Sequence, residues 1–463
     1  MSQAKKKLQF GRRTFLQGGI ATALTAASWH RVLGANERIG VGFIGYGLIG
    51  KRHLLDFQEQ PDAELRGVAE THAGRLAEAL ATIGTGARGH RDFRRMLEDK
   101  QIDAVVVSTP DHWHALPSML ACAAGKDVYV EKPLTLFVRE GRWMVDVATR
   151  HKRVVQVGTQ QRSGPHYQRV RDYLQAGKLG TISSVRMQSY RNIMPGYGKP
   201  ADCPPPADLD WDMWVGPSPE RAYNPNRAIY HFRWFWDYSG GQMTNLGAHQ
   251  IDILHWGLGL KGPLAVTSAG GRYSLQDNGE TPDTQDAIFE YPGFTATWSH
   301  REAARGLSES TPLEFFGSNG GMSVTRNGYV VTPDRKVIPA NTIPQFTDAH
   351  PVGGPVPVKD PGPVELRTAA IEDKTGNARE QLKLHVRNFL DCIKSRAQPI
   401  SDLESCHRVA VACHLANLSL RLGRKLRWDA DREEVIGDAE ANSLLVRPYR
   451  TPWDRELKSL GVS

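Results

Sequence analysis

The chain has 463 residues, of which 40% are hydrophobic and 23% charged, a composition typical of a globular protein with two domains. The net charge of +8 arises largely in residues 1–35, which carry six Lys or Arg side chains and no acid, leaving 52 basic against 50 acidic side chains elsewhere. Nucleic-acid binding requires a positive domain, so we predict no nucleic-acid partner, and no apolar run is long enough to span a bilayer.

Residues 1–35 predict a leader. Arg12 and Arg13 precede Phe15 and Leu16 and then a mildly apolar stretch without formal charge, a pattern typical of a twin-arginine export signal. The alternative is a basic disordered tail in which two arginines adjoin by chance. We predict export by the twin-arginine route to the periplasm or the medium, without stable membrane insertion unless the leader is retained.

A glycine-rich loop opens the first predicted domain, residues 36–158. An apolar strand over 38–44 runs into Gly-Tyr-Gly-Leu-Ile-Gly at 45–50, and a helix follows over 51–60. Glycines at this junction let the backbone approach a pyrophosphate at the helix N-terminus. The pattern predicts a dinucleotide site whose first contacts are Gly45, Tyr46, Gly47, Leu48 and Ile49.

Glu70 ends a second predicted strand over residues 64–69. A carboxylate about twenty residues after such a loop accepts hydrogen bonds from an adenosine ribose and repels a 2′-phosphate. We therefore predict NAD rather than NADP, with Arg75 as the one nearby residue that argues otherwise.

Two more apolar strands follow, as expected of a doubly wound parallel sheet. Residues 102–108 close on Thr-Pro-Asp-His-Trp-His, and residues 127–130 close on Glu131-Lys132-Pro133. Such sheets bind ligands at the carboxyl ends of their strands. The predicted contacts at these two ends are Ser108, Thr109, Pro110, His112, His114, Glu131 and Lys132.

The glycine loop, the Thr-Pro-Asp-His-Trp-His segment and Glu-Lys-Pro, in this order and spacing, resemble the Gfo/Idh/MocA family of NAD(P)-dependent sugar and cyclitol oxidoreductases. The resemblance covers about residues 38–430. It implies an α/β protein in which an N-terminal Rossmann domain joins a C-terminal α/β domain with an open, mainly antiparallel sheet. It also implies that the substrate lies between the two domains and that Lys132 holds the reacting hydroxyl.

The chemistry of Lys132, His112 and His114 can also be considered without the resemblance. A lysine partly desolvated at a strand end can have a lowered pKa and move a proton, whereas outside this family a lone lysine would be a solvated surface charge. His112 and His114 could ligate zinc, but no further ligand stands near them in sequence. We predict that they lie beside the nicotinamide ribose and that the protein holds no metal.

The second predicted domain spans residues 159–430, followed by a tail, 431–463, that wraps back onto the body. Strand-like runs without intervening helices predict an antiparallel sheet, with segments at 181–192, 264–273, 286–301 and 313–331. At the domain crossing, Arg162 either binds a substrate hydroxyl or carboxylate, or forms an interdomain salt bridge.

Asn245, His249 and Asp252 are spaced i, i+4 and i+7 and are predicted to share one helix face. The segment resembles the family's Asp-x-Gly-x-His, in which the histidine acts as acid and base, but Asn245 replaces the aspartate. We predict that Asn245 orients His249, that His249 is a weaker base or a neutral donor unless Asp252 supplies the charge, and that Asp252 adjoins the substrate. The alternative is a polar cluster that packs the helix.

An irregular stretch over residues 192–238 carries many aromatic side chains. Most are expected to pack this insertion against the sheet, while Tyr238 is predicted to face a sugar in the cleft.

The sequence thus predicts an NAD-dependent oxidoreductase acting on a ring hydroxyl of a carbohydrate or cyclitol, in which Lys132 and His249 handle the proton. An exported enzyme meets no free NAD pool, so its cofactor is predicted to be retained and recycled. The second hypothesis is an NAD-dependent glycosidase that works by transient oxidation, elimination and addition. The third is a sugar-binding pseudoenzyme. By resemblance we expect a homo-oligomer, either a dimer or a tetramer.

Overall fold

The structure is a computed structural model, and it describes residues 38–305, 312–336, 345–347, 350–354 and 365–462. The predicted leader, residues 1–35, lies outside these ranges, and the twin-arginine signal therefore stays a prediction. Within the described residues, no helix combines the length and apolar character needed to cross a bilayer.

The N-terminal sheet has six parallel strands in the order β3-β2-β1-β4-β5-β6. This order confirms the predicted Rossmann domain, because it reverses between β1 and β4 and opens a ligand crevice at their carboxyl ends. The strands read as apolar runs because helices cover both faces of the sheet. Their bounds are β1 Ile39–Ile44, β2 Ala63–Ala69, β3 Arg88–His90, β4 Ala104–Val107, β5 Asp127–Val130 and β6 Val155–Val157.

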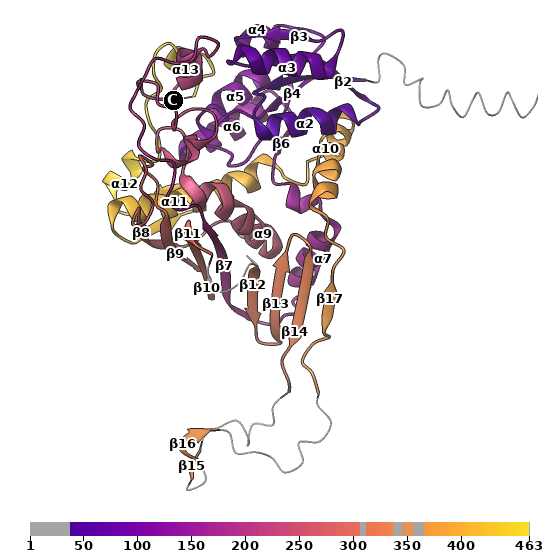
Figure 1. The fold of residues 1–463 in the computed structure, drawn as a ribbon. Coiled ribbons are helices and arrows are strands. Elements are labelled where there is room, and N and C mark those ends of the chain that lie inside the picture. Colours follow the sequence, from indigo (N-terminus) through magenta and orange to yellow (C-terminus); the bar gives the residue numbers. More distant parts are fainter. Residues whose placement is uncertain (1–37, 306–311, 337–344, 348–349, 355–364, 463) are drawn as a thin grey trace, which may run out of the picture.

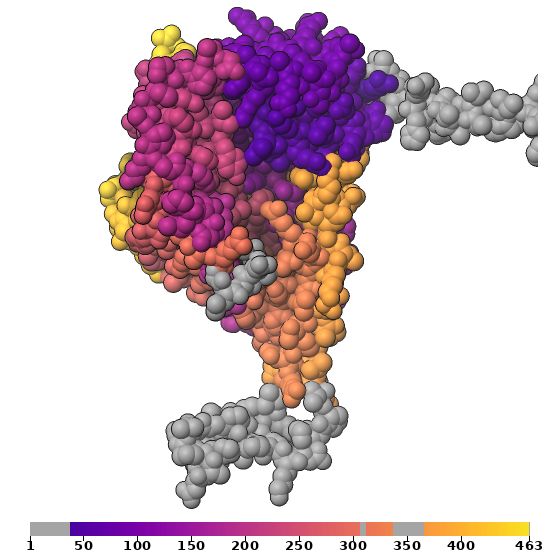
Figure 2. Space-filling model, viewed as in Figure 1, coloured from indigo at the N-terminus to yellow at the C-terminus, as the bar shows by residue number. Residues whose placement is uncertain are grey.

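Helices from both ends of the chain cover this sheet (Figure 1). One face packs against α2 (Leu48–Gln58), α3 (Ala73–Ile83) and α10 (Ala378–Ser395). The other packs against α4 (Phe93–Leu97), α5 (Ala115–Ala123), α6 (Val138–Arg150) and α13 (Trp453–Ser459). In sequence α10 belongs to the predicted second domain, yet Figure 2 shows its orange atoms directly against the indigo Rossmann domain.

The second domain is built on a mainly antiparallel sheet of eleven strands, as predicted, with β7 and β10 as its parallel pair. The path runs β17-β14-β13-β12-β7-β10-β9-β8-β18-β19, and β11 (Ala303–Ala304) pairs with β7. Its bounds are β7 Ile182–Asn192, β8 Ala265–Gly271, β9 Thr284–Tyr291, β10 Phe294–Arg301, β12 Leu313–Gly317, β13 Gly320–Thr325, β14 Gly328–Pro333, β17 Ile371–Asp373, β18 Leu426–Asp429 and β19 Glu434–Val435.

Three helices bury one face of this sheet, namely α7 (Pro165–Gln175), α9 (Ala248–Leu258) and α11 (Leu403–Leu422). The opposite face leaves Ile288, Phe316 and Val330 exposed. A two-stranded ribbon, β15 (Gln345–Thr347) and β16 (His350–Gly354), extends beyond the sheet.

The insertion over residues 192–238 has little regular structure beyond α8 (Trp211–Val215) and the 3-10 turn η3 (His231–Trp234). Its aromatic side chains form a separate buried cluster around Trp214 and Trp234. The C-terminal tail, which includes α12 (Ala439–Ser443), reaches the first domain, where the Trp453 ring stacks on Phe93 with centroids 6.3 Å apart. Insertion and tail therefore both lie against the Rossmann domain.

Candidate active site

The glycine loop between β1 and α2 has the backbone that a dinucleotide needs. Gly45 has φ +91°, a left-handed value, and a Cβ there would lie 2.9 Å from the Ser108 carbonyl oxygen. A Cβ at Gly50 would lie 2.4 Å from the Gly45 carbonyl oxygen, so the third glycine lets α2 approach the loop. Nothing lies within 4 Å of a Cβ built on Gly47, which faces a pocket of about 370 Å³. We call this pocket the cofactor pocket. Its glycine lining leaves room for the pyrophosphate of NAD.

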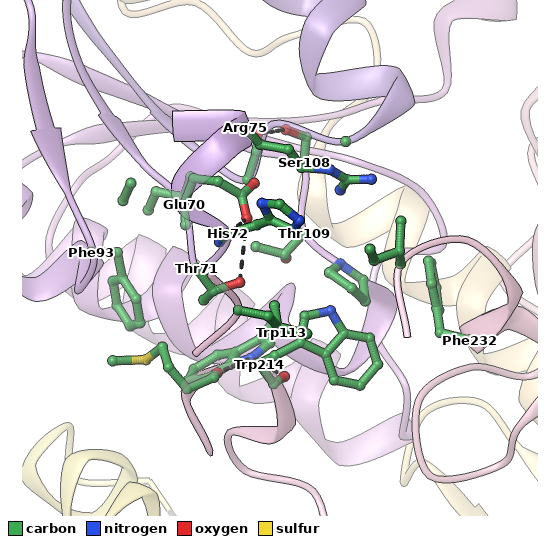
Figure 3. A pocket seen from close by; sticks show the side chains of 18 of the residues that line it. Glu70, Thr71, His72, Arg75, Phe93, Ser108, Thr109, Trp113, Trp214 and Phe232 are labelled. Carbon is green, nitrogen blue, oxygen red and sulfur yellow. Dashed lines mark hydrogen bonds between the residues drawn. The ribbon is translucent and has the colours of Figure 1, made fainter. Parts of the chain in front are cut away.

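Glu70 closes the end of β2 beside this loop. One carboxylate oxygen accepts from the Tyr46 backbone N–H at 2.7 Å, and the other accepts from that of His72 at 3.0 Å. Ser108 fixes the loop from the next strand by donating its hydroxyl to the Gly45 carbonyl at 2.8 Å. Figure 3 shows Glu70, Ser108 and Thr109 around the pocket. The carboxylate is thus held in the lining of the pocket, and its contact with a ribose stays a prediction.

The opposite wall of the cofactor pocket comes from the insertion. Backbone bonds attach it to the Rossmann domain, from Asp210 N to Thr71 O at 3.0 Å and from Ala73 N to Asp208 O at 2.8 Å. The Trp113 indole adds a bond of 3.0 Å to the Trp214 carbonyl. The insertion residues on this wall are Leu209, Met213, Trp214, Ile229, Tyr230, Phe232 and Arg233. Both domains therefore enclose the pocket.

Eight of the predicted cofactor contacts line this pocket: Gly45, Gly47, Leu48, Ile49, Glu70, Ser108, Thr109 and Pro110. The other five predicted contacts, Tyr46, His112, His114, Glu131 and Lys132, do not line it. Nε2 of His112 meets the Trp214 carbonyl at 2.9 Å, and burial lowers its pKa to about 3. The two ring nitrogens of His114 contact the carbonyls of Pro133 and Thr109, at 2.6 and 2.9 Å. These bonds to backbone carbonyls hold the two rings in place, and their position beside the nicotinamide ribose stays a prediction.

Lys132 stands at the carboxyl end of β5 and reaches across to the second domain. Its Nζ donates to the Asn245 side-chain oxygen at 2.9 Å and to the Asn245 backbone carbonyl at 3.0 Å. Burial lowers the pKa of Lys132 to about 8; the Glu131 carboxylate opposes this shift, and the Arg233 and Arg326 cations add to it. Glu131 itself is bonded to the His53 ring at 2.7 Å. Lys132 therefore has an amide partner and a pKa close to the physiological range.

Asn245 is oriented by a relay of side chains. Its Nδ2 donates to the Gln242 side-chain oxygen at 3.1 Å, and Gln242 donates to the buried Glu302 carboxylate at 3.0 Å. Glu302 also accepts from the Trp234 indole at 2.6 Å. The prediction that Asn245 orients His249 is wrong, because its amide is occupied by Lys132 and Gln242. The sequence did not predict a role for Gln242 or Glu302, because the two residues lie sixty positions apart in the chain.

His249 lies at the base of a second pocket, of about 340 Å³, which we call the substrate pocket. Its side chain is buried, and no polar group of the described chain bonds its Nδ1. Burial, together with the charges of Lys132 and Arg326, holds the pKa of His249 well below its usual value. A π-helical turn, η4 (Met243–Gly247), precedes α9 and changes the phase of the predicted helix face. His249 is therefore a neutral imidazole at the pocket wall.

Arg162 and Asp252 pair with each other. Nη2 of Arg162 lies 2.6 Å from the Asp252 carboxylate, and each side chain is 1% exposed. Burial alone would lower the pKa of Arg162, but Asp252 raises it above its ordinary value. Arg162 does form an ion pair, but with a residue of its own predicted domain and not across the domains, and neither side chain is free to meet a substrate.

Tyr238 does not face the cleft. It is fully buried in the insertion's aromatic cluster, with its ring centroid 4.9 Å from that of Trp214. The sequence reading also missed Arg326, which lines the substrate pocket from the turn between β13 and β14. Among the described side chains, no group of three or more His, Cys, Asp or Glu residues is arranged to hold a metal ion.

The fold and these pockets define a two-domain protein with a dinucleotide-binding Rossmann domain. Comparison with known families gives the same result: the family described as "Oxidoreductase family, NAD-binding Rossmann fold" matches residues 39–159. Its partner, "Oxidoreductase family, C-terminal alpha/beta domain", matches residues 174–268 and 371–455. The chain belongs to the Gfo/Idh/MocA oxidoreductase family, as the motifs predicted, and its cofactor is NAD.

Individual relatives match a smaller part of the chain than the family models do. Inositol 2-dehydrogenase 2 of Saccharopolyspora erythraea is 29% identical over 253 residues, which cover 54% of this chain and 62% of that protein. A Glycosyl hydrolase family 109 protein of Shewanella sp. (strain W3-18-1) is 34% identical over 120 residues, 24% of this chain and 26% of the relative. The chain spans less than two thirds of the length of these curated relatives.

A solved levoglucosan dehydrogenase, in complex with NADH and L-sorbose, superposes with a TM-score of 0.62 at 19% identity. The superposition covers 84% of this chain and 99% of that structure. At this identity the likeness establishes the fold, and it extends over both domains.

Proposed function

We propose that this protein is an NAD-dependent oxidoreductase that oxidises a ring hydroxyl of a carbohydrate or cyclitol. One observation carries the proposal: Lys132 bridges the two domains at Asn245, and its charge acts on His249 at the wall of the substrate pocket. The names of relatives, inositol 2-dehydrogenase and levoglucosan dehydrogenase, support this substrate class.

The proton chemistry follows from the two side chains. NAD⁺, when bound, accepts the hydride of the carbinol carbon, so the protein has only the hydroxyl proton to move. With a pKa of about 8, Lys132 is an amine in roughly a tenth of molecules at neutral pH, enough for Nζ to accept that proton. The neutral His249 ring hydrogen-bonds the same or a neighbouring hydroxyl and orients it. Asn245 is the positioning residue for Lys132.

We further propose that NAD stays bound through many turnovers. The insertion that walls the cofactor pocket, and its bonds to the Rossmann domain, support retention. Retention would suit the export that the leader predicts, because a lost cofactor could not be replaced outside the cytoplasm. The exposed apolar positions on the second sheet support a homo-oligomer that covers this face.

The test is the nucleotide content of protein purified without added cofactor and then denatured. We expect near-stoichiometric NAD(H), and a change in the absorbance of the bound cofactor when sugars or cyclitols are added. An empty protein that binds NAD weakly would contradict retention while leaving an ordinary dehydrogenase.

The match to a Glycosyl hydrolase family 109 protein favours the glycosidase as second candidate function. The same residues would oxidise a glycoside transiently, so that the aglycone is eliminated, water adds and the sugar is reduced again. Release of 4-nitrophenol from nitrophenyl glycosides without added NAD would favour this reaction over net oxidation.

A further inference from the structure

The turn over residues 325–328, between β13 and β14, is held on both sides. The His166 ring contacts the Thr325 carbonyl at 3.2 Å, and the Gln381 amide donates to the Arg326 carbonyl at 3.2 Å. The Gly376 N–H donates to the Asn327 carbonyl at 2.9 Å. Helices α7 and α10 thus fix the backbone at Arg326, although its side chain lies at the surface.

The guanidinium of Arg326 has no carboxylate of its own. It lines the substrate pocket, and within the described ranges it forms no ion pair or side-chain hydrogen bond. The acid beside this turn is Asp373 on β17, which pairs with Arg169 at 2.6 Å. Of the acids nearer the domain boundary, Glu131 pairs with His53 and Asp252 with Arg162. The pocket lining among described residues contains no Asp or Glu. Arg326 therefore carries a cation on a fixed backbone, without a counter-charge among the described residues.

Other cations reinforce this imbalance. The charge of Arg326 acts on both Lys132 and His249, and Arg233 of the insertion acts on Lys132 from the cofactor side. Arg233 likewise forms no ion pair within the described chain; it bonds the Tyr230 carbonyl at 3.1 Å. The carboxylates of Glu131 and Asp111 act on Lys132 in the opposite sense, but neither lines the substrate pocket, so a neutral sugar would leave Arg326 without a counter-charge there.

We propose that the natural substrate is a sugar that carries an anionic group, a carboxylate or a phosphate, and that Arg326 binds this group. The planar guanidinium offers paired N–H donors that match the oxygens of either group, which makes Arg326 a residue that determines substrate specificity. The inference rests on the proposed function for the identity of the pocket, and it narrows the substrate class within it.

Binding tests the inference without requiring turnover. Titration calorimetry on the full NAD-loaded protein would compare D-glucuronate, D-glucose 6-phosphate and neutral D-glucose. We expect at least one anionic sugar to bind about tenfold or more tightly than glucose, and the better of the two identifies the group as carboxylate or phosphate.

Two variants locate the effect. Arg326→Gln should remove the anionic preference, a loss of about 10- to 100-fold for the charged sugar with glucose changed less than about twofold, while Arg326→Lys should keep part of it. Arg427→Gln is the matched control, because Arg427 is exposed on β18 near the other end of the same sheet and forms no ion pair within the described residues. Equal binding of charged and neutral sugars by the wild type, including no binding of either, overturns the inference. So does a preference that survives in Arg326→Gln.

These outcomes separate the inference from the proposed function. Binding that depends on Arg326, without any change in the cofactor's absorbance, would retain the inference and reject the oxidation. Oxidation of neutral sugars at the same rate in wild type and Arg326→Gln would do the reverse.

Discussion

Two cations, the buried Arg162 and the half-buried Lys132, reach the same segment of the second domain and meet different partners. Arg162 meets the carboxylate of Asp252 on α9, and its charge is fully matched. Lys132 meets the amide of Asn245 on the preceding π-helical turn, and its pKa falls to about 8. A desolvated cation with a carboxylate partner stays charged and has a structural role, whereas one with an amide partner can give up its proton. The partner of each cation thus determines whether the contact stabilises the fold or takes part in proton transfer.

The largest effect is expected for Lys132→Met. This change removes the proton acceptor, so turnover of the fastest carbohydrate substrate should fall roughly 10²- to 10⁴-fold, measured as NADH formed by the purified protein. Thermal stability should not fall, because an apolar side chain replaces a partly desolvated ammonium. Lys126→Met is the control, since Lys126 is also buried in the first domain but bonds the Asp99 carbonyl away from the pockets. Turnover that persists in Lys132→Met would show that Lys132 is not the acceptor.

Mutation of the Arg162–Asp252 ion pair should reduce stability, in contrast to Lys132→Met, which should reduce turnover. Asp252→Asn leaves the buried Arg162 with only the more distant Asp402 carboxylate, at 4.0 Å, and we expect the free energy of unfolding in urea to drop by about 3 kcal/mol. Replacing both partners, with Arg162→Met and Asp252→Leu, should recover much of this loss because no buried charge remains. If the double variant is no more stable than Asp252→Asn alone, Arg162 and Asp252 do more for stability than neutralise each other.

A smaller effect on turnover is expected when Lys132, like Arg162, is given a carboxylate partner. Asn245→Asp places a carboxylate against Lys132 and raises the lysine pKa from about 8 towards its ordinary 10.5. The reactive amine is then rarer at neutral pH, so kcat/KM should fall about tenfold there and its rise with pH should shift upward by about one unit or more. The pH profile is the readout. Asn319→Asp, in the outer turn between β12 and β13, should leave the profile unchanged, and an unshifted profile in Asn245→Asp would contradict the assignment.

The sequence predicts most of the Rossmann domain because its signals are local. The strand, glycine loop and helix at residues 38–58 stand together in the chain, and apolar runs mark β4 and β5. Period-two patterns likewise locate the second sheet. The packing of α10 on the first domain has no such signal, because an amphipathic sequence specifies a buried face and not the surface that buries it.

The site was predictable to the extent that it rests on motifs. Lys132 reaches the segment that precedes His249, where the π-helical turn makes Asn245 its partner. Tyr238 is an aromatic residue like its neighbours, and nothing local distinguishes a ring that faces a cleft from one in a cluster. Asn327-Gly328 signals a hairpin turn, but that Arg326 lines the pocket follows only from the pairing of β13 and β14.

The position of α10 also determines when the first domain can be completed during synthesis. Phe389 of α10 packs edge-on against Phe57 and Tyr129, with ring centroids 6.3 and 5.8 Å apart. These partners leave the ribosome more than two hundred residues before Phe389, so one face of the nucleotide domain lacks part of its apolar cover until the second sheet has been translated. A fragment that stops near residue 158 would therefore expose core aromatic rings and aggregate. We therefore expect nucleotide to be loaded by the nearly finished chain and not by its first third.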